Sequence, residues 1–258
     1  MIEHAILLSA GQGSRLLPLT AEIPKCLINL SGRPLIAWQI EMLARGGVKH
    51  VDVVTGFMTD MVEAAVKDIS DERISVECHF NPFFKVADNL GSCWIVRERM
   101  CRDFLILNGD TLVGEDIMGT AQQGGSNGPL GGGWPITVTV DIKPAYDSDD
   151  MKVTRVDERL VRIGKTLTAQ ESNAESIGLL AFRGEGADLF REKVREMMRM
   201  PDGVNHWYLK AIDMLADTGK VGTVSIDGMD WAEVDYLTDV EDAGELTESW
   251  ARAPRPSE

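Results

Sequence analysis

The 258-residue sequence predicts an α/β fold built on a parallel sheet. A continuous apolar run from His4 to Ala10 stops at Gly11, as expected of a strand that is buried on both faces. Apolar residues then recur at helical intervals over 35–45, a second apolar run covers 51–56, and another helical stretch covers 58–68. This strand–helix–strand–helix order implies parallel strands joined by right-handed crossovers.

A third buried strand is expected at 104–107, after a less regular stretch over 74–84 and a helix over 90–100. The strand leads into the sequence Asn108-Gly109-Asp110-Thr111. In open α/β sheets, ligands bind outside the carboxyl ends of the strands. The position of Asp110 therefore marks a candidate binding edge.

The remainder of the chain mixes strands and helices less regularly. Seven glycines crowd into residues 119–135, which we expect to form a mobile loop, with a linker or a lid as equal alternatives. We expect one domain over 1–250, with halves at 1–118 and 136–250, and a disordered tail over 251–258. The elements expected after the loop are a strand over 136–142, a hairpin over 155–163, a strand over 177–182, a helix over 186–200, short strands over 221–226 and 231–234, and a terminal helix over 236–250.

The composition argues against several classes of protein. With 44% hydrophobic and 26% charged residues, the chain has the composition of a soluble globular protein. A net charge of −15 opposes binding to nucleic acid or to an anionic membrane, so neither is an expected partner. No stretch approaches 18 consecutive apolar residues and the N-terminus lacks a secretory signal, which predicts a cytoplasmic protein. The four cysteines form no Cys-x-x-Cys pair and are expected to be reduced packing residues.

The first strand runs into a glycine loop that is followed by two cations. Gly11 and Gly13 let the backbone approach a ligand closely, and successive N–H groups in such a turn can bind phosphate oxygens. Arg15 offers a planar fork to terminal phosphates, and Lys25 offers a compact charge to the phosphate under attack. The loop lacks the Gly-Lys-Ser/Thr ending of a Walker loop, and Leu16 stands where a dinucleotide-binding loop has its third glycine. The pattern therefore predicts a phosphate-binding loop of another kind.

A longer pattern surrounds this loop. It reads Ala-Gly-x-Gly-Ser-Arg-Leu-x-Pro-Leu-Thr from Ala10, then Pro-Lys-x-Leu from Pro24 and Gly-x-Pro-Leu-Ile from Gly32. This pattern resembles the N-terminus of the sugar-phosphate nucleotidyltransferase superfamily. The resemblance implies a GT-A type, Rossmann-like fold, with a mixed, mainly parallel sheet and helices on both faces, and the use of Mg²⁺. It also implies a nucleotide-binding first half, an acceptor-binding second half, and nucleotide contacts from Ala10, Gly11, Gly13, Ser14, Arg15 and Lys25, of which Arg15 and Lys25 are the catalytic residues.

Three carboxylates are candidate metal ligands. Asp110 is similar to the acid that ends a strand in this family, and Glu233 and Asp235 follow far along the chain. Alternation along a short strand would place Glu233 and Asp235 on one face, where both could reach one metal ion. Mg²⁺ prefers oxygen ligands, usually one or two carboxylates together with water and phosphate oxygens. Asp110 and Asp235 are the favoured pair, with Glu233 as a third ligand.

The segment before the third strand bears on the choice of nucleotide. Asn89 and Ser92, which begin a helix, stand where hexose-1-phosphate enzymes usually carry glycines. This arrangement resembles the CTP-dependent branch, which includes phosphocholine, aminoethylphosphonate and inositol-1-phosphate cytidylyltransferases. Asn89 and Ser92 could therefore contact the base or ribose of CTP, although a helix cap at Asn89 is an equal alternative.

These observations predict the transfer of CMP from CTP to a small phosphate or phosphonate, with release of pyrophosphate. The alternatives are a hexose-1-phosphate uridylyl- or thymidylyltransferase and, in another class, a non-catalytic nucleotide-binding regulatory subunit. The sequence also leaves a homodimer open. Charged and aromatic side chains of the second half are candidates for binding the acceptor, and they include Lys152, Lys165, Glu175, Trp207 and Trp231.

Overall fold

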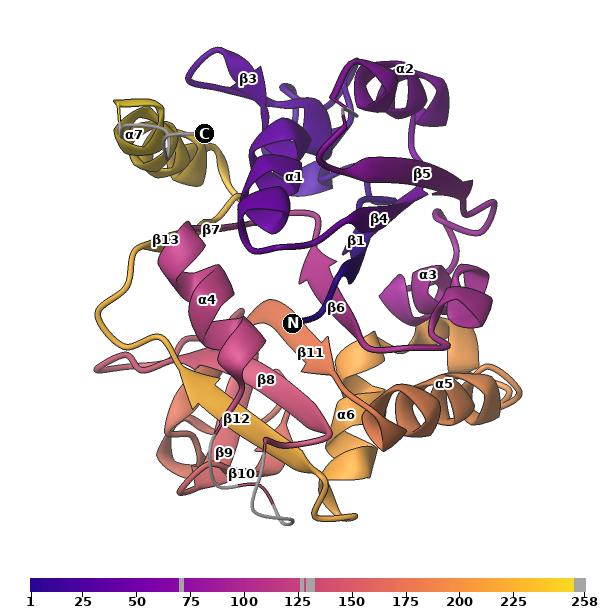
Figure 1. Cartoon of the computed structure of the whole chain (residues 1–258), viewed down its shortest axis with the longest axis vertical. Coiled ribbons are helices and arrows are strands. Elements are labelled where there is room, and N and C mark those ends of the chain that lie inside the picture. Colours follow the sequence, from indigo (N-terminus) through magenta and orange to yellow (C-terminus); the bar gives the residue numbers. More distant parts are fainter. Residues whose placement is uncertain (70–71, 126–127, 129–132, 253–258) are drawn as a thin grey trace.

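A nine-stranded mixed sheet organises the chain (Figure 1), in the strand order β5-β4-β1-β6-β11-β8-β12-β10-β9. The structure is a computed structural model that describes residues 1–69, 72–125, 128 and 133–252. The strands of the sheet are β1 His4–Leu8, β4 His50–Thr55, β5 Ser75–Phe80, β6 Phe104–Asn108, β8 Ile136–Asp141, β9 Lys152–Val156, β10 Arg159–Ile163, β11 Ala174–Phe182 and β12 Val221–Ser225. Two small sheets join β2 Asn29–Leu30 to β3 Arg33–Pro34 and β7 Thr111–Val113 to β13 Trp231–Glu233.

The first half of the sheet is parallel, as the order of elements predicts. Strands β5, β4, β1 and β6 are neighbours and run in the same direction. The second half is mixed, because β11 runs antiparallel to β6 and β8, whereas β8 and β12 are parallel. Strand β11 also pairs with β9, so it ties the parallel half to the β8–β12–β10–β9 group.

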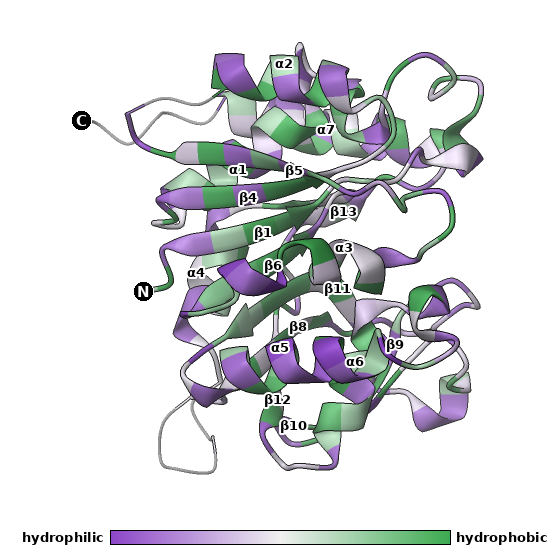
Figure 2. Cartoon of the chain, turned by 90° about the vertical axis from the view of Figure 1, so that its right-hand side faces the viewer, coloured by the Kyte–Doolittle hydropathy of each residue, from purple (hydrophilic) through white to green (hydrophobic). Residues whose placement is uncertain are grey.

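Helices cover both faces of the sheet. On one face, α3 Asn89–Ile95, α5 Glu185–Met197 and α6 Tyr208–Ala216 pack on a core that includes Phe104 and Phe182. On the other, α1 Leu35–Arg45, α2 Thr59–Ile69 and α4 Glu115–Gln123 pack against Leu7 and Leu105. Figure 2 shows the apolar strands β1 and β6 in the middle of the sheet, whereas hydrophilic residues colour much of α5 and α6. Among the described helices, none combines the length and apolar content needed to cross a bilayer.

A third cluster attaches the last helix to the loop region. Helix α7 Leu237–Arg252 packs with α1 and the 14–30 region through Ala243, Trp38 and Leu16, and the Trp250 ring lies 6.1 Å from that of Trp38. The carboxyl-terminal segment is thereby held next to the glycine loop, although the two are far apart in sequence.

Several sequence predictions need correction. Residues 74–84 contain strand β5, which reads irregularly because it lies at the sheet edge and is only half buried. The helix predicted over 90–100 is α3, which ends at Ile95 and is followed by a 3-10 turn. Strand β7 and helix α6 were not predicted.

The start predicted for the glycine-rich loop over 119–135 is also wrong. Residues 119–123 belong to helix α4, because Ile117, Met118 and Ala121 bury its inner face and Gly119 leaves open space around it. Residues 126–127 and 129–132, on which the prediction of mobility falls, lie outside the described residues. The tail predicted over 251–258 begins later than expected, since α7 extends to Arg252, and residues 253–258 are likewise outside the described part.

The aromatic core between the sheet and α5 should dominate stability. The Phe182 ring stacks on Phe104 with centroids 4.5 Å apart and lies 4.6 Å from Phe190. Phe182→Ala should lower the free energy of unfolding by about 3–5 kcal/mol, because it removes buried contacts and leaves a cavity. Urea denaturation measures the change. The same substitution at Phe83, which is 52% exposed, is the control and should cost far less; equal losses would contradict this account of the core.

Candidate active site

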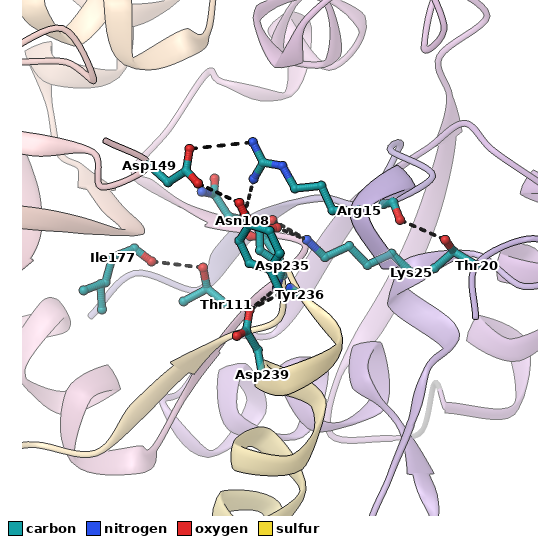
Figure 3. A network of polar contacts seen from close by, with 12 residues as sticks. Arg15, Thr20, Lys25, Asn108, Thr111, Asp149, Ile177, Asp235, Tyr236 and Asp239 are labelled. Atoms are coloured by element: carbon teal, nitrogen blue, oxygen red, sulfur yellow. Dashed lines mark hydrogen bonds and ion pairs between the residues drawn. The ribbon is translucent and has the colours of Figure 1, made fainter. Parts of the chain in front are cut away.

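A buried lysine bridges two carboxylates that come from distant parts of the chain (Figure 3). The Lys25 ammonium donates to Asp110 Oδ2 at 2.9 Å and to Asp235 Oδ1 at 2.6 Å. Only 11% of the Lys25 side chain is exposed. Burial disfavours the charged amine, but the carboxylates of Asp110 and Asp235 outweigh this effect and raise the pKa of Lys25. Lys25 is therefore a cation at neutral pH.

Two glycines make this arrangement sterically feasible. Gly13 has φ +72°, and a Cβ atom there would lie 3.0 Å from the Cβ and Cδ atoms of Lys25, so the lysine stem crosses directly over it. The Gly13 carbonyl accepts a hydrogen bond from Thr20 Oγ1 at 2.8 Å. A Cβ atom at Gly109 would lie 2.3 Å from the carbonyl oxygen of Leu8, so β1 and β6 approach each other closely just before Asp110. The local role of Gly13 is thus to admit Lys25.

The small β7–β13 sheet brings the carboxyl-terminal acids to Asp110. Glu233 pairs with Thr111 in the antiparallel register, and the Val234 N–H donates to the Asp110 carbonyl at 3.0 Å. Strand β13 ends at Glu233, so the strand alternation predicted for Glu233 and Asp235 does not extend to Asp235. Instead, Asp235 is placed by the turn into α7.

The turn before α7 is held by a side chain that the sequence did not single out. Asp239 Oδ2 accepts from the backbone N–H groups of Asp235 at 2.8 Å and of Tyr236 at 2.7 Å. An acid in the first turn of a helix that reaches back to preceding N–H groups is a capping arrangement. An acid four residues after Asp235, at the expected start of a helix, was the available signal.

The three predicted metal ligands lie together. Ligand atoms of Asp110, Glu233 and Asp235 all fall within 4.8 Å of one another. Asp110 Oδ1 is buried and has no hydrogen-bond partner among the described residues. Glu233 is open to the cavity described below, yet partial desolvation and the charges of Asp110 and Asp235 raise its pKa to about 8. The crowded acids therefore favour a proton on Glu233, and Asp110 Oδ1 remains unused.

Arg15 is a second cation that contacts this cluster. Its Nη1 lies 3.1 Å from Asp235 Oδ2, and its guanidinium carbon lies 5.4 Å from the centre of the Tyr236 ring. Tyr236 in turn donates its hydroxyl to Asp149 Oδ2 at 2.6 Å. Tyr236 was not predicted as a site residue, and neither its type nor its position in the sequence distinguishes it from a packing aromatic.

Two adjoining cavities open beside this cluster, and both are lined by Asn89, Asn108 and Asp110. The larger has a volume of about 500 Å³ and also contains Glu233 and Asp235. The smaller has a volume of about 250 Å³ and lies against the glycine loop. The carboxylate cluster thus stands where a ligand in one cavity would meet a ligand in the other.

Only some of the residues predicted to contact the nucleotide line the smaller cavity. Ala10, Gly11, Asn89 and Ser92 line it, whereas Gly13 and Ser14 do not. Asn89 does cap a helix, but the helix is α6 rather than its own, since Asn89 Oδ1 accepts from the Tyr208 N–H at 2.8 Å. Within the described residues, no hydrogen bond of the Asn89 amide N–H₂ group is found, so this donor remains available to a ligand.

Hydrogen bonds to other side chains also hold Ser92 and Asn108 in place. Ser92 is buried, and its hydroxyl accepts from Asn81 Nδ2 at 3.2 Å. Asn108 Oδ1 accepts from the Tyr208 hydroxyl at 3.1 Å. Asn108 ends a buried strand and was not predicted as a site residue, although the same strand-end position was the signal that identified Asp110.

Four of the five predicted acceptor residues line the larger cavity, namely Lys165, Glu175, Trp207 and Trp231. The fifth, Lys152, is not among its lining residues. It is buried, and its ammonium donates to the carbonyl oxygens of Asp147 at 2.6 Å and Asp150 at 3.3 Å. Lys152 therefore supports the backbone of the loop that forms one wall of the cavity.

A lysine and two acids form a second charged group in this cavity. Lys143 Nζ lies 2.7 Å from Glu175 Oε2 and 3.0 Å from Asp150 Oδ1. Burial raises the pKa of Glu175 to about 7, against the opposing effect of Lys143. Lys143 was not predicted, because a lysine beyond a strand end looks like an ordinary surface residue.

Comparisons with known proteins find a matching family model and similar sequences. The model of the nucleotidyl transferase family matches residues 4–145. The CTP:phosphoglutamine cytidylyltransferase of Campylobacter jejuni is 23% identical over 262 residues, which cover 92% of this chain and 98% of that protein. The choline-phosphate cytidylyltransferase of Streptococcus pneumoniae is 31% identical over 102 residues, which cover 40% of this chain and 42% of that protein.

Solved structures share the fold over nearly the whole chain. The inositol-1-phosphate CTP transferase of T. maritima superposes with a TM-score of 0.79 at 18% identity, covering 99% of this chain and 98% of that one. The UDP-glucose pyrophosphorylase of Acinetobacter baumanii superposes with a TM-score of 0.72 at 16% identity, covering 97% and 99%. The GT-A type fold predicted from the sequence is confirmed, and the fold alone does not distinguish the nucleotide used.

The buried Glu175 should make stability depend on pH. Its folded-state pKa of about 7 lies above the ordinary value of 4.5, so the folded state holds a proton that the unfolded state releases between these values. The stabilisation is complete below about pH 4.5 and is lost as pH rises through 7, by at most about 3 kcal/mol. Glu175→Gln should flatten this part of the profile of unfolding free energy against pH, whereas Glu22→Gln at an exposed position should leave it unchanged. A profile with the same slope in Glu175→Gln would contradict the assignment.

Proposed function

The chain belongs to the nucleotidyl transferase family, and on that premise we propose that it is a cytidylyltransferase. It transfers CMP from CTP to a small phosphate or phosphonate and releases pyrophosphate. The observation that carries the proposal is the bridge from Lys25 to Asp110 and Asp235 at the junction of the two cavities. Residues 1–250 act as one domain, whose halves bind the nucleotide and the acceptor, and we place the enzyme in the cytoplasm.

The carboxylate cluster fits a Mg²⁺ ion. The three clustered acids supply oxygen ligands, and the buried Asp110 Oδ1 lacks any other partner among the described residues. Asp110 and Asp235 would hold the ion, with Glu233 as a third ligand. Bound there, Mg²⁺ would supply charge neutralisation for the phosphate oxygens of the nucleotide.

The residues of the chain perform positioning and electrostatic stabilisation. An oxygen of the acceptor phosphate or phosphonate forms a bond to the α-phosphorus of CTP, and the bond from that phosphorus to the bridging oxygen of pyrophosphate breaks. Lys25 stabilises the charge at the phosphorus under attack, and Arg15 stabilises the departing pyrophosphate. No side-chain nucleophile takes part in this reaction.

The larger cavity favours an acceptor that carries a cation. Besides the metal-binding acids, six carboxylates line it against two lysines, Lys143 and Lys165. Three aromatic side chains, Trp207, Trp231 and Tyr236, line the same space. Carboxylates and aromatic faces together recognise ammonium groups. A phosphate or phosphonate that bears an amine or a quaternary ammonium is therefore the acceptor class that the lining fits best.

The smaller cavity is suited to cytosine. The unused amide donor of Asn89 can bond N3 of the base, which is an acceptor in cytosine but carries a hydrogen in uracil, while Asn89 Oδ1 remains engaged with the Tyr208 N–H. The alternative of a hexose-1-phosphate uridylyl- or thymidylyltransferase would need a different base contact here. The alternative of a non-catalytic regulatory subunit is disfavoured because Arg15, Lys25 and all three acids are present and converge.

Pyrophosphate release is the direct test of the reaction. With Mg²⁺, we expect turnover with CTP and an amine-bearing acceptor when four NTPs are crossed with phosphocholine, aminoethylphosphonate, inositol-1-phosphate and glucose-1-phosphate. Lys25→Ala should lower kcat by about 10²–10³-fold, because it removes a preorganised charge at the reacting phosphate. Asp110→Asn should also abolish turnover, whereas Lys67→Ala, at an exposed position of α2, should not.

Two outcomes would overturn the proposal in different ways. Turnover confined to glucose-1-phosphate with UTP or dTTP would support the hexose-1-phosphate alternative. Tight binding of an NTP without turnover of any of the four acceptors would count against the proposal and favour the regulatory subunit.

Base preference tests the role of Asn89. Asn89→Asp retains an oxygen for the Tyr208 N–H but replaces the free amide donor with an acceptor, which suits the N3–H group of uracil instead of cytosine. The ratio of kcat/KM for CTP to that for UTP should fall by about 10-fold or more, because the variant loses a hydrogen bond to cytosine and gains one to uracil. The free energy of unfolding should be nearly unchanged, because the cap is kept. An unchanged ratio would show that Asn89 serves only α6.

A further inference from the structure

Three of the four histidines of the chain gather around one buried acid, far from the proposed active site. His4 begins β1, His50 begins β4, and His79 lies near the end of β5. In the strand registers His4 lies beside His50, and Asp52 lies beside Glu77. Because alternate residues of a strand share a face, these side chains project from the sheet face that α3 covers.

Each of the three imidazole rings places its Nε2 atom next to the carboxylate of Asp52, whose side chain is fully buried. His4 Nε2 lies 2.7 Å from Asp52 Oδ2, and His50 Nε2 lies 3.1 Å from Asp52 Oδ1. His79 Nε2 lies 2.7 Å from Asp52 Oδ1. The nearest cation is Arg99, whose Nε is 3.8 Å from Asp52 and whose guanidinium is paired with Glu77 at 2.5 Å.

We propose that this cluster is a binding site for a divalent transition metal ion such as Zn²⁺. The protein ligands are His4 Nε2, His50 Nε2 and the Asp52 carboxylate, and water supplies the fourth position. His79 is a positioning residue that donates to the carboxylate. The ligand atoms of His4, His50 and Asp52 already lie within 4.8 Å of one another.

The distances suit tetrahedral zinc. Bonds of about 2.0–2.1 Å to nitrogen and oxygen place neighbouring ligand atoms about 3.3 Å apart. His4 Nε2 lies 2.7 Å from Asp52 Oδ2 and His50 Nε2 lies 3.1 Å from Asp52 Oδ1, so the two histidines contact different carboxylate oxygens at separations about 0.6 and 0.2 Å shorter than this. The metal would replace the protons that these nitrogens now share with the carboxylate, so small side-chain movements suffice.

Outer partners are in place for His50 and Asp52, whereas His4 Nδ1 is buried with no hydrogen-bond partner among the described residues. His50 Nδ1 lies 2.8 Å from the Ser75 hydroxyl, which can fix the ring with Nε2 free to bind metal. His79 Nε2 lies 2.7 Å from Asp52 Oδ1 and can orient the carboxylate by donating to that oxygen. Such partners orient metal ligands and raise their affinity. The His50 side chain is 33% exposed, so an ion can enter from that side.

The set of donors distinguishes this site from the carboxylate cluster. Imidazole nitrogen suits Zn²⁺, Cu²⁺ and Ni²⁺, whereas Mg²⁺ prefers oxygen alone. The histidines stand at the start of β1 and β4, and Asp110 follows the end of β6, at the opposite edge of the parallel strands. An ion here would link β1 to β4 and stabilise the strand that carries the glycine loop.

Histidine ring resonances test the proposal directly. EDTA-treated, ¹⁵N-labelled protein is titrated with ZnCl₂ and followed in long-range ¹H–¹⁵N spectra. One equivalent should change the Nε2 shifts of His4 and His50 from protonated to metal-bound values. His206, which is paired with Asp202 at 3.2 Å elsewhere in the fold, is the internal control and should not change.

Variants separate this site from the proposed active site. His50→Ala should weaken Zn²⁺ affinity by more than the roughly 10–100-fold that loss of an outer partner costs, and His79→Gln should fall within that range. His206→Ala should have no effect, and the Asp110→Asn/Asp235→Asn double variant should retain the His4 and His50 shifts. Unchanged histidine resonances under excess Zn²⁺, or shifts that disappear only in the double variant, would overturn the proposal whether or not the enzyme transfers CMP.

Discussion

The contact of one lysine with two acids governs the arrangement of the whole site. Lys25 comes from the loop after β1, Asp110 follows β6, and Asp235 precedes α7, so their contact joins three distant segments. Each approach has its own structural requirement. Gly13 must lack a side chain to admit the lysine stem, β7 must pair with β13, and α7 must pack on α1 and the loop region. The sheet therefore positions the charges, and the charges in turn hold the loop to the carboxyl-terminal segment.

The distribution of charge explains how a protein of net charge −15 can use anionic substrates. Negative charge repels a polyanion in general, but Lys25 and Arg15 form a local cationic region, next to acids suited to a metal ion, to which we assign the phosphates in the proposed function. The larger cavity keeps an acidic surplus beyond these groups, which favours a cationic head on the acceptor. In the proposed reaction, one set of acids would assist the nucleotide through metal binding, and a second set would assist the acceptor through direct attraction.

Sequence reasoning worked best where one local pattern decides the structure. The buried runs at β1 and β6 and the helical spacing of α1 identified the parallel half, and strand-end placement identified Asp110. It was less successful where tertiary packing decides. Edge strand β5 is only half buried, and α4 contains a glycine that its packing tolerates. Lys143 gains its role from Glu175, a partner far along the chain that no local pattern records. Asp239 binds backbone N–H groups three and four residues before it, a local capping signal that was available in the sequence. Lys152 is buried against backbone carbonyl groups of its own loop, a direction that a lysine in a strand does not reveal.

The late position of Glu233 and Asp235 has a consequence for biosynthesis. Strands β1, β4, β5 and β6 can pair while the chain is still growing, because every member of that parallel group precedes residue 109. The carboxylate cluster, by contrast, cannot close until β13 and the first turn of α7 have left the ribosome. A nascent or prematurely terminated chain can thus build the phosphate loop without the acids that complete the site. The complete carboxylate cluster therefore forms only after the chain has been synthesised through the start of α7.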